Sequence, residues 1–176
     1  MQKWIILVVV CVILILGTII MMNVDIETEY VPETEIEDIE LRKTIVTLYF
    51  NNTQTSELAK ETRLIDSKEL LKSPYEVLIK MLLQGPENSS YTKAIPENTN
   101  LISAELKNDC VELNFSKEFI GNFENITLKA NAIYSIVNTL TELTEVNSVK
   151  FLFEGEETEA FSDCNIDLKN PIERKL

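Results

Sequence analysis

The chain has 176 residues and carries a formal net charge of −13 at pH 7 without a single histidine. This acidic balance removes the electrostatic attraction to phosphate backbones on which nucleic-acid binding depends. The lack of histidine excludes catalytic triads built on Ser-His or Cys-His pairs and removes the commonest nitrogen ligand for zinc. We therefore expect no nucleic-acid partner.

Residues 4–22 read WIILVVVCVILILGTIIMM, an uncharged run of the length that a helix needs to cross a hydrocarbon core about 30 Å thick. Lys3 precedes the run and acids follow it, which places the N-terminus in the cytoplasm and the rest outside. We expect residues 1–22 to form an uncleaved signal anchor in the cell membrane. A cleaved signal peptide ending near Gly17 and a lipoprotein modified at Cys11 are the alternatives.

Residues 23–42 form an acidic stretch with Pro32 in it and no basic residue before Arg42. Like charges repel one another and extend such a segment. We expect an extended linker here, and a strand built on Val24, Ile26, Tyr30 and Val31 is the alternative.

The first half of the globular part, which we expect to span residues 43–162, begins with strands predicted at residues 45–50 and, more weakly, 58–65. Ser73-Pro74-Tyr75-Glu76 has the form of a capping box, so a helix is predicted from Ser73 to Gln84. Gly85-Pro86 is typical of a helix end. The helical spacing predicts that one face is buried, consisting of Val77, Leu78, Met81 and Leu82.

A tight β-hairpin is predicted next, with strands at residues 101–106 and 110–115. Asn108-Asp109 lies between them, and both residue types tolerate the positive φ of such a turn. On the second strand the alternation places Val111, Leu113 and Phe115 on the apolar face and Cys110 on the other face. We expect Cys110 and Cys164 to remain separate thiols, with a disulfide between them as the alternative.

A long helix is predicted at residues 127–143, preceded by Ile126 as a hydrophobic staple and with a buried stripe of Ala130, Ile133, Val137 and Leu140. Strands are predicted at residues 149–155 and 157–161, and residues 163–176 read as a polar C-terminal tail. The order of elements predicts an α+β fold in which two helices pack on one face of a small, mainly antiparallel sheet.

No pattern in the sequence indicates a catalytic, metal-binding or cofactor-binding site. The 29 acids include no pair set apart by its spacing, so a hydrolase based on paired carboxylates is the least favoured reading. Calcium loops, zinc motifs and phosphate-binding glycine loops are all absent from the sequence. We therefore predict no catalytic residues, no metal site and no cofactor.

Six segments in order resemble the sporulation and spore germination (GerM) domain family: TIVTLYF from Thr44, LLQGP from Leu82, IPENT from Ile95, NDCVELNFSKEF from Asn108, YSIVNTLTEL from Tyr134 and VKFLFEG from Val149. The residues that carry the resemblance, and to which it gives a structural role, are Leu48, Phe50, Gly85, Pro86, Pro96, Phe115, Tyr134, Asn138, Phe151 and Gly155.

The resemblance implies a domain similar to the ring-building motifs of secretion-type assemblies, within cell-envelope proteins of Gram-positive bacteria. It implies no catalytic residues. This chain departs from the family pattern in having Asn108-Asp109 where Asp-Gly is common, and in joining one copy of the domain to a helical anchor. Many members are instead lipoproteins with two copies.

Together these observations predict a non-catalytic, membrane-anchored, extracytoplasmic assembly module. Its expected partners are envelope or sporulation proteins, with a homo-oligomer as one form, and it would bind them through a sheet edge or a helix face. The alternative is a module that binds cell-wall glycan or a small ligand and uses aromatic residues such as Tyr75 and Tyr91 as stacking surfaces.

Overall fold

The structure is a computed structural model that describes Trp4, residues 43–121 and residues 123–175. Apart from Trp4, the predicted anchor and the predicted acidic linker lie outside these residues. In the part of the chain that is described, no helix is both long enough and apolar enough to span a membrane.

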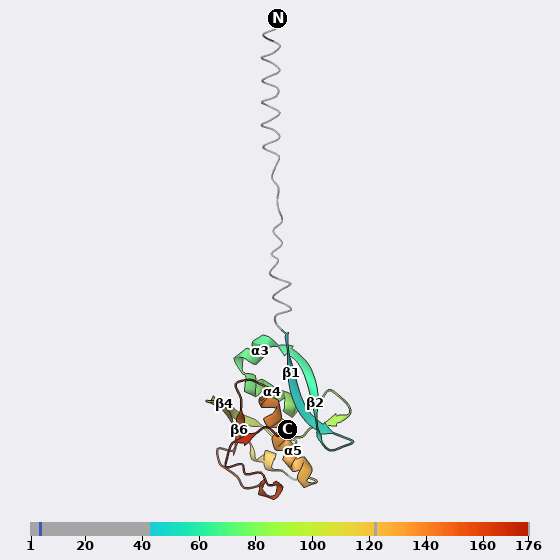
Figure 1. The fold of residues 1–176 in the computed structure, drawn as a ribbon, viewed down its shortest axis with the longest axis vertical. Helices are drawn as coiled ribbons and strands as arrows, with labels where there is room; N and C mark the ends of the chain where they lie inside the picture. The colour runs from blue at the N-terminus through green and yellow to red at the C-terminus, as the bar shows by residue number, and fades with distance from the viewer. Residues whose placement is uncertain (1–3, 5–42, 122, 176) are drawn as a thin grey trace. The chain divides into compact units, whose positions relative to one another are not determined.

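A long antiparallel hairpin opens the domain and confirms the two strands predicted there. It consists of β1 (Lys43–Asn52) and β2 (Leu58–Asp66), and the short strand β3 (Tyr91–Thr92) pairs with the far end of β1 to give the order β2-β1-β3 (Figure 1). Side chains alternate across the hairpin, so Val46, Leu48 and Phe50 are buried in the core. Ile45 and Leu64 lie opposite each other in the pairing and remain exposed.

The six-residue helix α3 (Ser67–Lys72) follows β2 and was not predicted. Asp66 begins it by accepting a hydrogen bond from the N–H of Lys68, at 2.9 Å. None of its residues is buried, so the sequence shows no apolar stripe that could have indicated a helix.

Helix α4 (Pro74–Gln84) begins and ends at the predicted residues, but the predicted capping box is wrong. The side chain of Ser73 makes no cap hydrogen bond, and its backbone N–H instead ends α3 by donating to the carbonyl of Glu69. Gly85 ends α4 with a φ of +100°, a conformation that favours glycine, and its N–H donates to the carbonyl of Met81.

The buried face of α4 differs slightly from the predicted one. Leu78, Ile79 and Leu82 are buried, whereas Val77 and Met81 are only half-buried. Ile79 is buried as well because α4 contacts β1, β4 and the helix α5 (Ile126–Leu140) at the same time, so a wider part of its surface is covered.

The second sheet has the order β4-β5-β6-β7, formed by β4 (Leu101–Lys107), β5 (Cys110–Phe115), β6 (Ser148–Phe153) and β7 (Ile172–Glu173). The predicted β4–β5 hairpin is confirmed, with Asn108 at a φ of +60° in its turn. Strands β5 and β6 are parallel. The α+β class is confirmed, and four of the five strand pairings among the described residues are antiparallel, as predicted. The prediction of a single sheet is wrong, because these residues form two sheets and the central pair of the second one is parallel.

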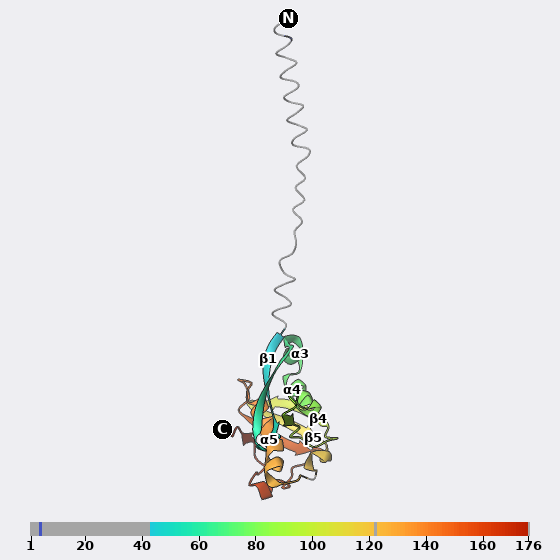
Figure 2. The same ribbon diagram turned by 90° about the vertical axis from the view of Figure 1, so that its right-hand side faces the viewer.

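The parallel pairing has a simple cause. Helix α5 lies between β5 and β6 in the chain, and a helical crossover returns the chain to the starting end of β5 so that β6 runs in the same direction. The prediction that both helices cover one face of a single sheet is also wrong. In both views α4 lies between the two sheets (Figures 1 and 2), and α4 and α5 each contact strands of both.

Helix α5 confirms the longest predicted helix, although it ends three residues earlier than expected. Asn125 caps it by accepting a hydrogen bond from the N–H of Leu128, at 2.9 Å. Ile133, Val137 and Leu140 are buried as predicted, and Ala130 is half-buried. The predicted staple is wrong, because Ile126 is the first helical residue and is 57% exposed.

The C-terminal part adds to the core more than its sequence suggested. Residues 157–161 form no strand, and a single bridge between Phe153 and Glu156 is all that pairs there. After the one-turn helix η2 (Ser162–Cys164), Ile166 and Leu168 are buried and β7 pairs with β6. Both cysteines of the domain, Cys110 and Cys164, are free thiols, as expected.

Candidate functional site

Helix α5 takes the place of a neighbouring strand along part of β1. Strand β3 pairs only with Asn51 and Asn52, so the edge of β1 at Tyr49 faces α5 instead. The hydroxyl of Ser135 donates to the carbonyl of Tyr49 at 2.6 Å, and the N–H of Tyr49 donates to the hydroxyl of Thr139 at 3.2 Å. Both hydroxyl side chains are completely buried, so they satisfy backbone groups that water cannot reach.

This docking of α5 against β1 creates a groove on the outer side of the hairpin. Its volume is about 820 Å³. The groove is bounded by three parts of the chain that are distant in sequence: the hairpin, the outer face of α5 and the last described residues. The lining residues are Tyr49, Glu57, Leu58, Lys60, Ile126, Thr127, Ala130, Asn131, Tyr134, Asn138, Arg174 and Lys175.

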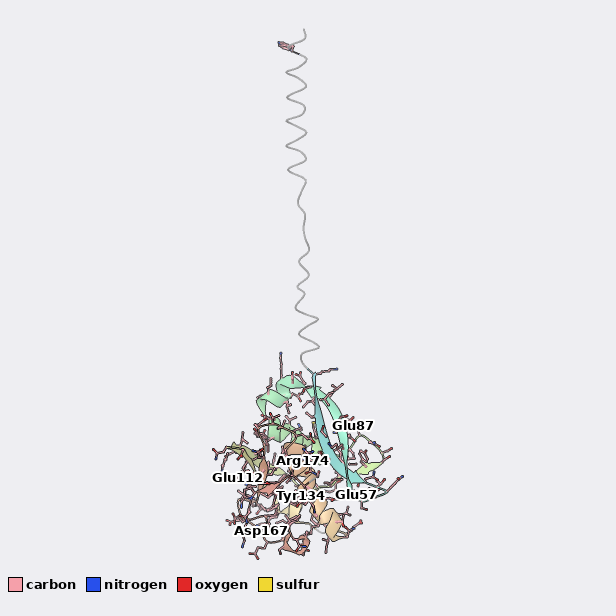
Figure 3. All side chains as sticks on the ribbon, viewed as in Figure 1. Glu57, Glu87, Glu112, Tyr134, Asp167 and Arg174 are labelled. Atoms are coloured by element: carbon pink, nitrogen blue, oxygen red, sulfur yellow. The ribbon has the colours of Figure 1, made fainter. Side chains whose placement is uncertain are left out.

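Figure 3 labels one residue from each part of this groove. Glu57 of the hairpin turn, Tyr134 of α5 and Arg174 of the C-terminal segment lie near one another in this view. The amide of Asn131 fixes the turn beside them, because its Nδ2 donates to the side-chain oxygen of Asn51 at 2.7 Å and to the carbonyl of Ser56 at 2.9 Å.

A polar cluster forms one wall of the groove. The hydroxyl of Tyr49 donates to Oε1 of Glu142 at 2.6 Å, Arg174 donates to both of these groups, and the ammonium of Lys60 lies 3.8 Å from the same carboxylate oxygen. Burial and the bond to Glu142 raise the pKa of Tyr49 to about 12. The Tyr49 hydroxyl holds the pKa of Glu142 below its usual range, with further help from Arg174. At neutral pH the cluster is therefore a neutral phenol, a carboxylate and two cations, and it offers no free general base.

Asn138 is the unusual residue of the groove. Asn138 is only 7% exposed, and its Oδ1 has no hydrogen-bond partner among the described residues. Buried acceptors are nearly always satisfied, and one that is not points to a water molecule or a ligand. One turn earlier on the same helix, Tyr134 is half-buried. The ammonium of Lys175 lies over its ring, 5.4 Å from the centroid.

A second buried polar cluster has a structural role. Arg63 of β2 donates to the carboxylate of Glu61 at 2.7 Å and to the carbonyl of Gly85 at 2.6 Å, and Glu61 also accepts from the N–H groups of Glu87 and Asn88. Desolvation acts to raise the pKa of Glu61, but these N–H groups and Arg63 outweigh it and hold that pKa below the usual value. The cluster ties β2 to the end of α4.

The residues singled out by the family resemblance fall into three groups. Leu48, Phe50, Phe115 and Phe151 are fully buried in the core. Gly85 ends α4, Gly155 has a φ of +84° in the turn after β6, and Pro86 and Pro96 line a second hollow of about 590 Å³ beside β3. Tyr134 and Asn138 meet in the groove beside α5.

The aromatic residues expected as stacking surfaces do not meet in one site. Tyr75 and Tyr91 are half-buried, and both pack against the hydrophobic core. Tyr91 also lines the second hollow, together with Pro86 and Pro96.

Nothing in the described part of the chain has the arrangement of a catalytic or metal centre. No group of three or more acidic or cysteine side chains among the described residues could hold a metal ion. The groove is lined by one carboxylate, Glu57, so it lacks the facing pair of acids that a glycosidase requires.

The family of this domain follows from comparison with known proteins. The family described as sporulation and spore germination (Germane) matches residues 26–159, so the chain belongs to that family. Among curated proteins, no relative matches the sequence at a significant level.

Solved structures share this fold. The tandem GerMN domains of the sporulation protein GerM from Bacillus subtilis match with 25% identity and a TM-score of 0.61 over 76% of this chain, which spans 46% of their length. A candidate lipoprotein from Clostridium perfringens matches with 27% identity and a TM-score of 0.52, covering 74% of this chain and 87% of that one. The first GerMN domain of GerM alone, at 18% identity and a TM-score of 0.56, covers 66% of this chain and 86% of that one and supports the fold.

Proposed function

We propose that this chain is a non-catalytic, membrane-anchored module of a sporulation or cell-envelope protein complex. Its family membership supports the process, and the uncharged run at residues 4–22 supports the anchor and the extracytoplasmic location. A geometry similar to a ring-building motif, with other envelope proteins or further copies of the chain as partners, is part of the same proposal.

The outer face of the β1–β2 hairpin is the observation that carries this proposal. Strand β2 pairs only with β1 among the described residues, so its outer edge has no partner strand over nine residues. Next to that edge Ile45 is 68% exposed and the opposing Leu64 is 66% exposed. A long edge with an apolar cross-strand pair is a place where a strand from another chain can add.

Crosslinking tests the proposal. A photoreactive residue at Leu64 of the full-length chain should give a discrete protein adduct in membranes from sporulating cells, and Leu64→Glu should weaken the association measured by co-purification. The same probe at Lys117, an exposed residue of η1 (Lys117–Ile120), is the control. Equal labelling at both positions, or no adduct at Leu64, would count against pairing at this edge.

Binding to cell-wall glycan or a small ligand is the alternative function. Its site would be the groove lined by Tyr134 and Asn138, because the rings of Tyr75 and Tyr91 pack against the core. Sedimentation of the full-length chain with purified peptidoglycan measures it directly, and retention that Asn138→Leu abolishes would favour this reading.

A further inference from the structure

We propose that the groove beside α5 binds an acidic, extended segment of a partner protein. The inference deepens the proposed function by naming the chemistry of the partner, and it rests on that function only in taking the ligand to be a protein segment. The groove lies on the same face of the hairpin as the exposed Ile45–Leu64 pair, because Tyr49 and its partner Lys60 are two alternations further along the strands. One extended segment could therefore contact both places.

The charge of the groove is opposite to that of the whole chain. The groove is lined by three cationic side chains, Lys60, Arg174 and Lys175, and by one acidic side chain, Glu57. The chain as a whole has a net charge of −13. The carboxylate of Glu142 lies behind this wall and is already engaged by Tyr49, Arg174 and Lys60. An excess of cations in an acidic protein attracts acidic ligands and repels basic ones.

The side-chain oxygen of Asn138 lacks a hydrogen-bond donor within the described part of the chain. Its Oδ1 is buried and has no partner among the described residues, while the residue itself lines the groove. The backbone N–H groups of an extended peptide are donors of the required kind, and a rotation of the buried Asn138 amide toward the groove on binding would pair an acceptor that is otherwise left unpaired. The half-buried Leu58 and Ala130 and the exposed Ile126 provide the apolar surface that peptide side chains would cover.

A glycan would supply donors too, but the Tyr134 ring favours a peptide. Sugars bind aromatic residues by stacking on an open ring face. Here the ammonium of Lys175 lies 5.4 Å from the ring centroid, so a cation occupies a face of that ring. The cation that obstructs stacking is also a ready partner for a carboxylate.

Fluorescence polarisation of labelled peptides on the full-length chain in detergent micelles is the test. The probes are a capped peptide of alternating Glu and Val and a matched peptide of alternating Lys and Val. We expect saturable binding of the acidic probe alone, weakened about tenfold by Asn138→Leu, in line with the loss of one buried hydrogen bond. The charge-reversed double variant Lys60→Glu/Lys175→Glu should lose the acidic probe and gain the basic one.

Lys107→Gln is the matched control, because Lys107 is an exposed cation of β4 that does not line the groove, and it should leave binding unchanged. Circular dichroism checks that each variant is folded. If Asn138→Leu is not folded, the charge-reversed variant decides. The proposal is overturned if the acidic probe does not bind, if binding ignores the groove variants, or if glycan chains bind in a way that Asn138→Leu abolishes. Failure of the crosslink at Leu64 with intact peptide binding would instead count against the proposed function.

Discussion

The docking of α5 on β1 gives the sharpest prediction. Ser135→Ala removes the hydroxyl that donates to the carbonyl of Tyr49 at 2.6 Å, in a position with no exposed surface. The unpaired buried carbonyl should cost about 1–3 kcal/mol. Alanine has a better helix propensity than serine by a few tenths of a kcal/mol, which offsets a small part of this loss. We expect a net decrease in unfolding free energy of roughly 1–2 kcal/mol.

Urea unfolding of the full-length chain, followed by circular dichroism, measures this loss. Ser103→Ala, at an exposed position of β4, is the control and should change the midpoint little. Thr139→Val removes the acceptor of the Tyr49 N–H, and a double-mutant cycle with Ser135→Ala should show coupling because both side chains hold the same residue. If Ser135→Ala unfolds at the midpoint of the wild type with the same slope, the bond between α5 and β1 does not contribute as we argue.

Three further predictions concern the core, the buried ion pair and one turn. Ile133→Asp should unfold the domain, because it places an unpaired charge at a fully buried site, and cooperative melting at an unchanged temperature would contradict this. The lowered pKa of Glu61 means that its stabilising contribution is present above the pKa of the unfolded chain, about 4.3, and is lost as pH falls through the folded value. Glu61→Gln should therefore flatten the decline of stability below about pH 4.3, and an equally steep decline in this variant would exclude the explanation. Gly85→Ala should lower the free energy of unfolding by about 1–2 kcal/mol, because φ is +100° there and the added Cβ would lie 2.9 Å from Cε of Lys93. Thermal unfolding measures this, and a rise in melting temperature would be inconsistent with it.

The sequence predicted the elements whose side chains repeat with a clear period. The alternation in β5 and β6 and the helical stripe of α5 are long enough to be recognised, and those elements are present. Helix α3 has no buried residue, and β7 is two residues long, so neither leaves a periodic pattern. The parallel pairing of β5 with β6 depends on how the chain crosses over, which side-chain alternation does not indicate.

The groove was harder to predict than the fold. Tyr134 and Asn138 could be singled out through the family resemblance, but their neighbours Lys60 and Arg174 come from distant parts of the chain. One signal was available in the sequence. Asn131, Ser135 and Thr139 recur every four residues along α5, and such a polar stripe on a helix that packs into the core must meet hydrogen-bonding partners.

The position of the C-terminal segment has a practical consequence for experiments on this protein. Arg174 and Lys175 form part of the groove wall, and Arg174 also bonds to Tyr49 of the first strand. A fluorescent reporter or affinity tag fused after Lys175 would emerge beside the groove, where its linker could occupy the site. An acidic epitope tag placed there would resemble the ligand that we propose, so internal labels on the β4–β5 turn at Asn108 are the safer choice.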